Sequence, residues 1–337
     1  MIDFRYHIVS LGAVFIALAV GIILGAGPLQ NSIGETLSNE VTALKETNSE
    51  LRSENDALRT DLTTNQELLQ EALPALLVDT SIGQNVVLIS LPNTTSEDIA
   101  SATETVNATG AKVVGVVRLT TAWVDQDASA YRTALAEQLR THLESYKVQN
   151  KTTFPLALDS EEQLLSAALA QILTSETADT ELTQTIRGLL TNAEKPLIEF
   201  EVNLSTPASV AIVLSPKYAT DESVITDEEK TALEAAAITT NGEFITYISA
   251  ITSLVPVVAS GYAESAADFV TVARENGALQ VTTDSFAQTS GQINLGLSIP
   301  AAVNKTTLHA GSGIGATTSL AKRVVLPPVE TSAETAN

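Results

Sequence analysis

The pattern of hydrophobic and polar positions changes twice along the chain. Residues 8–26 are apolar and carry no charged side chain, the stretch that follows is polar and rich in helix-forming residues, and short apolar runs then alternate with amphipathic stretches. These patterns predict a membrane helix, a long polar helix and a globular α/β domain. The predicted parts are a membrane anchor, a coiled coil, an extracytoplasmic α/β domain and a flexible tail, at residues 1–28, 29–75, 80–320 and 321–337.

The apolar segment has the length of a membrane span. A helix over residues 8–26 would be about 28 Å long, close to the thickness of the hydrocarbon core of a bilayer. A signal-peptide core is usually shorter, about 7 to 15 residues, which favours a retained anchor; a signal peptide cleaved after Gly27 is the alternative. Arg5 precedes the segment and Lys45 is the next basic residue. Because positive charge tends to stay in the cytoplasm, we expect a single span in the inner (cytoplasmic) membrane with the C-terminal domain outside.

Small side chains recur every four residues inside this segment, at Ala13, Ala17, Gly21 and Gly25. On a helix they form one stripe, and Gly21 with Gly25 makes a GxxxG motif, which lets two membrane helices approach closely. Small residues are also common in membrane helices for other reasons. The stripe therefore supports pairing of two membrane helices only if the next segment favours self-association as well.

The polar segment has a heptad repeat that extends over about five heptads. Position d holds Leu37, Leu44, Leu51 and Leu58, and position a holds Val41, Asn48, Asn55 and Leu62. Asparagine at position a pairs with itself across a parallel dimer and fixes the register. The heptads therefore predict a parallel coiled-coil stalk, which Pro74 ends. A solvated single helix is the alternative.

The charges beside the heptad face support a parallel dimer. Glu40 would face Lys45 of a second copy, and Glu54 would face Arg59. Both pairs are opposite in sign, as positions g and e of a parallel homodimer require. We expect the partner to be either a second copy of this chain or another coiled-coil protein of the cell envelope.

The third part alternates strand and helix patterns. Predicted strands lie at residues 85–91, 112–119 and 209–215, with shorter candidates at 243–249, 254–260 and 279–283. Predicted helices lie at residues 96–109, with Ser96 as N-cap, and at 127–147, 160–175, 179–193, 227–240, 265–276 and 289–303. The alternation predicts one doubly wound, Rossmann-like α/β head with a helical insertion at residues 127–200.

Composition narrows the possible functions. The chain has 40 acidic and 18 basic residues, a formal charge of −22. Nucleic acids and anionic lipid surfaces repel such a polyanion, so we expect no nucleic-acid partner. Cysteine is absent, which removes disulfides, thiolate metal sites and cysteine nucleophiles.

The motifs give no catalytic, cofactor or metal site. The turn after the first strand, LPNTTSED, lacks the glycines that a pyrophosphate needs, and GxSxG is absent. The glycine-rich stretch HAGSGIGAT, residues 309–317, predicts a flexible or turn role. Of the histidines, His7 abuts the membrane segment, His142 lies at a core edge of a helix, and His309 precedes the glycines.

The start of the chain resembles an actinobacterial family named mycobacterial copper transport protein B, MctB. The stretch RYHIVSLGAVFIALAVGIILG carries the resemblance, through Arg5 and His7 before VSL, through AVF and ALA, and through Gly21 and Gly25. The coiled coil, the α/β head and HAGSGIGA follow in the same order. The resemblance implies an envelope protein, an outer-membrane copper transporter needed for copper homeostasis. Corynebacterial relatives are also linked to septation, working with a cell-wall hydrolase that carries its own coiled coil.

Residue chemistry separates these two implications. Cu(I) prefers thiolate and thioether ligands, and the chain has no Cys, one Met and three His. We therefore expect a non-enzymatic envelope scaffold or regulator that binds a partner, such as a cell-wall hydrolase, during cell-wall remodelling or septation. Copper transport or copper homeostasis across the envelope, with an outer-membrane location, is the alternative.

Overall fold

The computed structural model describes residues 4–150, 158–175, 181–192, 194–219 and 226–327. The chain divides into two compact units, Met1–Glu67 and Leu68–Asn337. The first unit contains most of one helix, and the second contains the end of that helix and the whole α/β head. Each unit is described by itself.

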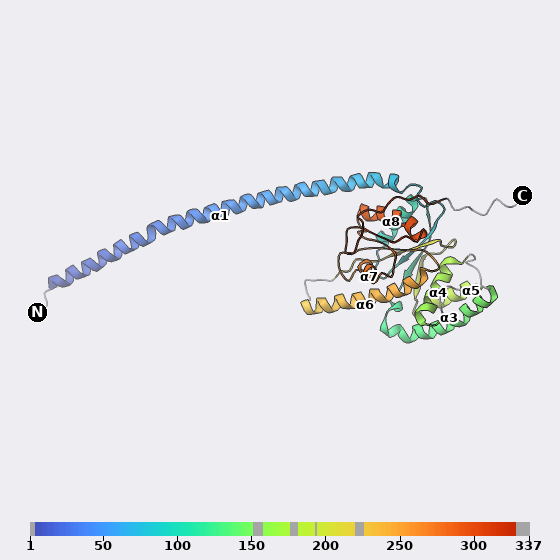
Figure 1. The fold of residues 1–337 in the computed structure, drawn as a ribbon. Helices are drawn as coiled ribbons and strands as arrows, with labels where there is room; N and C mark the ends of the chain where they lie inside the picture. The colour runs from blue at the N-terminus through green and yellow to red at the C-terminus, as the bar shows by residue number, and fades with distance from the viewer. Residues whose placement is uncertain (1–3, 151–157, 176–180, 193, 220–225, 328–337) are drawn as a thin grey trace. The chain divides into compact units, whose positions relative to one another are not determined.

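A single helix, α1, spans Phe4–Leu77 (Figure 1). Its segment Phe4–Gly25 is long and apolar enough to cross a membrane, which supports the predicted anchor. The predicted end at Pro74 is wrong, because the helix continues to Leu77. Proline lacks the N–H that would bond to the preceding turn, but Leu77 is fully buried against the head, and this packing holds the last turn in place.

The head contains a seven-stranded sheet in the order β3-β2-β1-β4-β5-β6-β7. All neighbours are parallel except β2 and β3. The order of the first six strands is that of a doubly wound Rossmann-like sheet, so the predicted fold class is confirmed. The strands are β1 Asn85–Ser90, β2 Lys112–Leu119, β3 Ile198–Val202, β4 Val210–Leu214, β5 Val257–Ser260, β6 Val281–Thr283 and β7 Leu308–Ala310.

Helices cover both faces of the sheet. They are α2 Ser96–Ala108, α3 Ser129–Asn150, α4 Glu161–Thr174, α5 Glu181–Leu190, α6 Asp227–Ile251, α7 Phe269–Asn276 and α8 Thr289–Val303. Short 3₁₀ helices lie at η1 Thr121–Trp123 and η2 Gln126–Ala128. The predicted helical insertion is α3 to α5, between β2 and β3. In Figure 1, α3 to α6 gather on one side of the head and α8 lies on the other.

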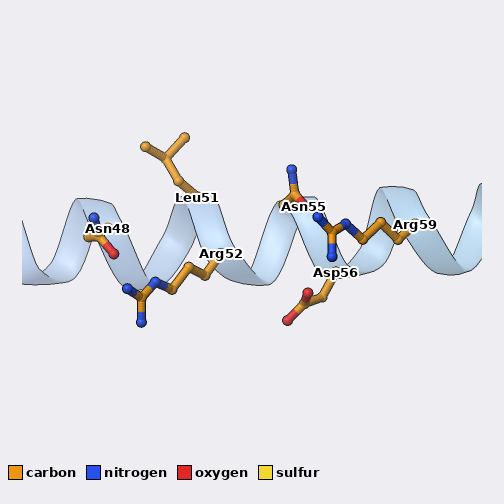
Figure 2. Close-up of a pocket in the computed structure, with 6 residues that line it drawn as sticks. All are labelled: Asn48, Leu51, Arg52, Asn55, Asp56 and Arg59. Carbon is orange, nitrogen blue, oxygen red and sulfur yellow. The ribbon is translucent and has the colours of Figure 1, made fainter. Parts of the chain in front are cut away.

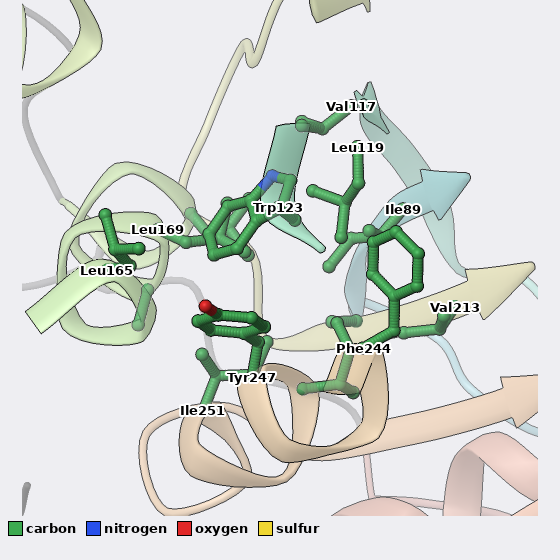
Figure 3. Close-up of a cluster of buried hydrophobic side chains, with 14 of the residues drawn as sticks. Ile89, Val117, Leu119, Trp123, Leu165, Leu169, Val213, Phe244, Tyr247 and Ile251 are labelled. Carbon is green, nitrogen blue, oxygen red and sulfur yellow. The ribbon is translucent and has the colours of Figure 1, made fainter. Parts of the chain in front are cut away.

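Successive side chains of a strand point to opposite faces of the sheet, so the sheet separates the core into two clusters. Val87 and Ile89 of β1 face the cluster built with α3 to α7, whereas Val86 and Leu88 face the cluster built with α2 and α8. The larger cluster is centred on Trp123 (Figure 3), which lies edge-on to the Tyr247 ring at a centroid distance of 4.9 Å. Burial is the main cause that raises the pKa of Tyr247 to about 12, so this phenol stays neutral at physiological pH.

Several local predictions need correction. Thr95, and not Ser96, is the N-cap of α2. The stretch 243–249, a strand candidate, belongs to α6, because its buried residues lie on one helical face against α4. The edge strands β3 and β7 were not predicted. Residues 321–327, expected in the flexible tail, are packed on the head; the rest of that tail, 328–337, lies outside the described residues.

Candidate functional site

The small residues predicted to line a membrane-helix contact lie on the surface of α1. Ala13, Ala17, Gly21 and Gly25 are all exposed within this single chain. A Cβ added at Gly21 or Gly25 would meet nothing within 4 Å. The stripe is therefore open to a second helix, and its pairing stays a prediction.

The heptad positions of α1 are also exposed. Leu37, Leu44, Leu51, Leu58 and Leu62 expose 56–68% of their surface, and Val41 exposes 43%. Leucine side chains scattered singly on a surface are ordinary. A row of leucines that repeats every seven residues is different, because it forms one continuous apolar stripe of the width that a coiled-coil partner covers.

Two asparagines interrupt this stripe (Figure 2). Asn48 and Asn55 lie one turn before and one turn after Leu51, and all three line an open groove of about 440 Å³ with Arg52, Asp56 and Arg59. Figure 2 shows Leu51 and Asn55 on one side of the helix and Arg52 and Asp56 on the other. The groove is open and is lined by residues of α1 alone.

The basic residues of the stalk carry a further signal, to which Arg52 adds. Lys45, Arg52 and Arg59, the basic residues of the stretch 37–67, all fall at position e. In an antiparallel pair, position e faces position e, and like charges would then lie opposite one another. The charge pattern thus opposes an antiparallel arrangement as well as favouring a parallel one.

The first turn of α2 lies where doubly wound proteins often bind ligands, at the switch point between β1 and β4. Its backbone donors bond within the turn itself: the amide of Asp98 donates to Thr95 Oγ1 at 3.0 Å, and the hydroxyl of Thr95 donates to Asp98 Oδ2 at 2.8 Å. Glu97 and Asp98 also place two carboxylates there. This end of the helix is therefore electrostatically unsuited to phosphate.

A cleft of about 590 Å³ lies beyond the carboxyl ends of β4 and β5. Four of its side chains pair with one another: Lys217 Nζ lies 2.6 Å from Glu264 Oε2, and Ser265 Oγ donates to Glu234. The buried Tyr218 hydroxyl has no hydrogen-bond partner among the described residues. The hydrogen bond to Glu264 is the main cause that raises the pKa of Lys217. The cleft has balanced charge and presents no convergent set of groups that indicates a ligand.

The glycine-rich stretch encloses a buried ion pair that the sequence analysis missed. Arg274 Nη1 lies 2.7 Å from Asp284 Oδ2, with side chains 3% and 0% exposed. The other carboxylate oxygen, Oδ1, accepts hydrogen bonds from the amides of Ser312 and Gly313 at 2.9 and 3.1 Å. The loop amides that could cradle a bound anion thus hold a carboxylate of the protein itself.

This ion pair explains why position 311 is a glycine. A Cβ on Gly311 would lie 2.2 Å from the Asp284 carboxyl group, and the residue has φ +140°, in the left-handed region. Only glycine lets the backbone approach the carboxylate so closely. The predicted turn role is confirmed, and the stretch is a close-packed turn, held by the ion pair rather than flexible.

His309 belongs to the same network. Arg274 Nε donates to Thr282 Oγ1 at 2.9 Å, and the same hydroxyl lies 2.9 Å from His309 Nδ1. The arginine and the histidine ring therefore share one hydroxyl group. Burial, and secondarily the charge of Arg274, lowers the pKa of His309. The histidine thus has a structural partner in Thr282.

The remaining histidines do not join it. His7 is exposed on α1 and His142 is half-buried on α3, at the core edge where it was expected. Within the described ranges, no group of three or more His, Cys, Asp or Glu side chains could hold a metal ion.

Comparison with known proteins identifies the family. Residues 1–320 match the family described as "Copper transport outer membrane protein, MctB". The chain belongs to the MctB family. This confirms the resemblance seen at the start of the sequence.

Curated MctB proteins match over part of their own length. The copper transporters MctB of Mycobacterium tuberculosis and Mycobacterium bovis are each 32% identical over 145 residues, 43% of this chain and 44% of theirs. The copper transporter MctB of Mycobacterium leprae is 32% identical over 129 residues, 38% of this chain and 41% of its own. The match covers less than half of each relative. These relatives are named as transporters and not as enzymes, and their names favour the copper alternative over the scaffold.

Proposed function

We propose that this MctB-family protein works in copper handling at the cell envelope as a membrane-anchored, non-enzymatic component. The family match over residues 1–320 is the observation that carries the proposal. The apolar helix Phe4–Gly25 supports membrane attachment. The family description supports an envelope location.

The side chains available as copper ligands restrict the role that this chain could have. Cu(I) prefers soft sulfur ligands, and the chain offers no cysteine and one methionine. Carboxylates are plentiful but are hard ligands that suit other ions better. The protein would therefore act on copper as part of an assembly, with the cargo held by a partner, and the heptad face of α1 is the surface suited to that assembly.

Copper tolerance of cells tests the proposal. Deleting the gene should lower tolerance, and the full chain should restore it. The Leu44→Ala, Leu51→Ala, Leu58→Ala triple variant should fail to restore it, whereas His142→Ala with His309→Ala should succeed. The matched control changes Glu46, Ser53 and Thr60 to Ala, at position f of the same heptads. Unchanged copper tolerance in the deletion strain would remove copper from the function.

A metal titration tests whether the chain binds the cargo by itself. The purified protein should compete with a Cu(I) chelator no better than a generic acidic protein of similar charge. A stoichiometric Cu(I) site in this titration would contradict the assembly model and favour direct transport.

Topology is proposed as a single span of the inner membrane, with the head outside the cytoplasm. The sparse positive charge between Arg5 and Lys45 supports this orientation. A reporter that is active only after export, fused after Asn337, should be active. A cytoplasmic reporter that works at the same position would reverse the topology.

A second candidate is an envelope scaffold in cell-wall remodelling or septation. The observation that favours it is the exposed heptad face, which is suited to a second copy or to the coiled coil of a cell-wall hydrolase. Here the deletion strain should form chains of unseparated cells at normal copper tolerance. The stalk triple variant should reproduce that defect, and normal cell separation in both strains would exclude this candidate.

A further inference from the structure

A third hydrophobic cluster of the head lies apart from the two main cores. It consists of Leu77, Ile293, Leu297, Ala310 and Ala321. Four segments meet there: the end of α1, α8, β7 through Ala310, and the chain after β7 through Ala321. A small satellite cluster has few apolar neighbours to support it, so it can open without unfolding the main core.

The chain after β7 supplies hydrogen bonds to carbonyls at the end of α1 and in the turn that follows it. The last carbonyls of a helix have no partner within the helix. Here the guanidinium of Arg323 donates to the carbonyls of Leu76 and Val78 at 3.0 and 2.8 Å. The amide of Leu326 donates to the carbonyl of Thr80 at 3.0 Å. One extended segment thus caps the end of the helix and the turn that follows it.

The same segment is pinned to α8 by one buried side chain. Asn294 is 1% exposed. Its Nδ2 donates to the carbonyl of Ser319 at 3.0 Å, and its Oδ1 accepts from the amide of Ala321 at 2.8 Å. The amide therefore bonds the segment through both of its ends, which fixes the register of the segment on the helix.

The segment itself has little independent stability. Residues 319–327 form neither a helix nor a strand. Ala321 and Leu326 are each 3% exposed, but Val324 and Val325 between them expose 38% and 51%. Attachment therefore rests on separate anchor points and lacks a continuous ladder of backbone hydrogen bonds. Such segments open locally at a small fraction of the cost of global unfolding.

The last turn of α1 is the element that would respond. Pro74 supplies no amide hydrogen to the turn before it. Leu77 packs against α8 only because position 296 is glycine, where a Cβ would lie 2.6 Å from the leucine methyl group. Once the cap is removed, the carbonyls of Leu76 and Val78 lose the guanidinium of Arg323. The turn keeps its bonds from the Val78 amide to the Pro74 carbonyl at 2.9 Å and from the Thr80 hydroxyl to the Leu77 carbonyl at 2.8 Å.

We propose that residues 319–326 form a latch that holds the end of α1 on the head. Closed, as in this structure, the latch caps α1 and completes the satellite cluster. Open, it frees the last turn of α1 and uncovers Leu77, Ile293 and Leu297, while the sheet stays folded. The latch makes the end of the stalk helix a joint that can be released independently of the core. This inference does not rest on the proposed role in copper handling.

Hydrogen exchange of the full chain in detergent or nanodiscs tests the latch. In Arg323→Ala, amides of residues 75–82 and 319–326 should exchange about tenfold faster or more, as expected when hydrogen bonds from a charged group are lost. Amides of β1 and β4 should be unchanged. Lys322→Ala is the matched control, because it removes a neighbouring exposed charge and should have no effect. Arg323→Lys should rescue part of the protection.

Leu326→Ala gives an independent test through the apolar anchor. It should raise exchange in the same two segments while Arg323 is intact. Wild-type protection of residues 75–82 in both Arg323→Ala and Leu326→Ala would overturn the latch. An equal rise in β1 and β4 would also overturn it, because the segment would then be part of the global core.

Discussion

The stalk and the head treat the same kinds of side chain in opposite ways. Leu44 of the stalk is 68% exposed, whereas Leu297 of the head is 2% exposed. Asn48 of the stalk lies on the surface, whereas Asn294 is buried with both ends of its amide bonded. The head satisfies its apolar and polar groups within one chain. The leucines of the stretch 37–67 repeat regularly but stay exposed within one chain. The proposed pairing with a second helix would bury them.

The largest effect is expected from removing the apolar face of the stalk. Changing Leu44, Leu51 and Leu58 to Ala should weaken association by roughly 2 kcal/mol or more for each leucine pair. The head should denature as in the wild type, because none of these side chains contributes to its core. Analytical ultracentrifugation and chemical denaturation measure the two properties separately. A triple variant that associates as tightly as the wild type would show that the stalk is not the interface.

Replacing Arg274 should destabilise the head and leave association through the stalk unchanged. Arg274→Ala leaves the buried Asp284 carboxylate without its partner, which should cost about 3–5 kcal/mol of unfolding free energy. Glu275→Ala, at the exposed neighbouring position, is the control and should be nearly neutral. Denaturant unfolding measures both variants.

Gly311→Ala provides a second test of the ion pair that leaves both charges in place. The added methyl group would collide with the Asp284 carboxyl group, so the head should again lose stability while association is kept. A head as stable as the wild type in both Arg274→Ala and Gly311→Ala would contradict the structural role of this pair.

A smaller effect is expected from the asparagines of the stalk. Changing Asn48 and Asn55 to Leu removes two polar groups from the predicted seam, and should tighten association by about 1–3 kcal/mol for each layer. Register and oligomer state should relax at the same time. Sedimentation equilibrium should reveal species above the dimer. Weaker association in this variant would mean that these positions do not lie in a seam.

The smallest effect concerns pH and the head alone. His309 has a lowered pKa when folded, through burial and the nearby Arg274, while the unfolded chain keeps a value of about 6.5. The unfolded state therefore binds more protons as the pH falls below about 6.5, and the unfolding free energy of the head should decrease there. His309→Gln should show a flatter dependence between pH 7.5 and 5.5. Equal slopes for the two proteins would remove His309 from the pH response.

The helices and strands that could be predicted are those whose hydrophobic pattern lies within the element itself. The apolar runs at 85–91, 112–119 and 209–215 became the central strands β1, β2 and β4, and α8 occupies the predicted range 289–303. Long buried runs carry their signal locally. The short edge strands β3 and β7 do not, because their neighbours decide whether they pair.

The wrong predictions also concern segments whose structure depends on residues far away in the sequence. The stretch 243–249 alternates like a strand, but its aromatic residues pack on α4 as one face of a helix. Pro74 does not end α1 because distant residues, Arg323 among them, support the turn beyond it. The Arg274–Asp284 pair was invisible in the sequence for the same reason: the two residues stand on different elements, and only the glycine spacing hinted at a close approach.

Self-association through the stalk is the central claim, and a single introduced cysteine tests it most directly. The chain contains no cysteine, so Leu51→Cys in the full chain reports on position d alone. A parallel dimer in register places the two introduced thiols opposite each other, and mild oxidation in membranes should convert most of the protein to a disulfide-linked dimer. Glu50→Cys, one residue earlier at position c, should stay monomeric under the same conditions. Equal and weak crosslinking at both positions would contradict the account.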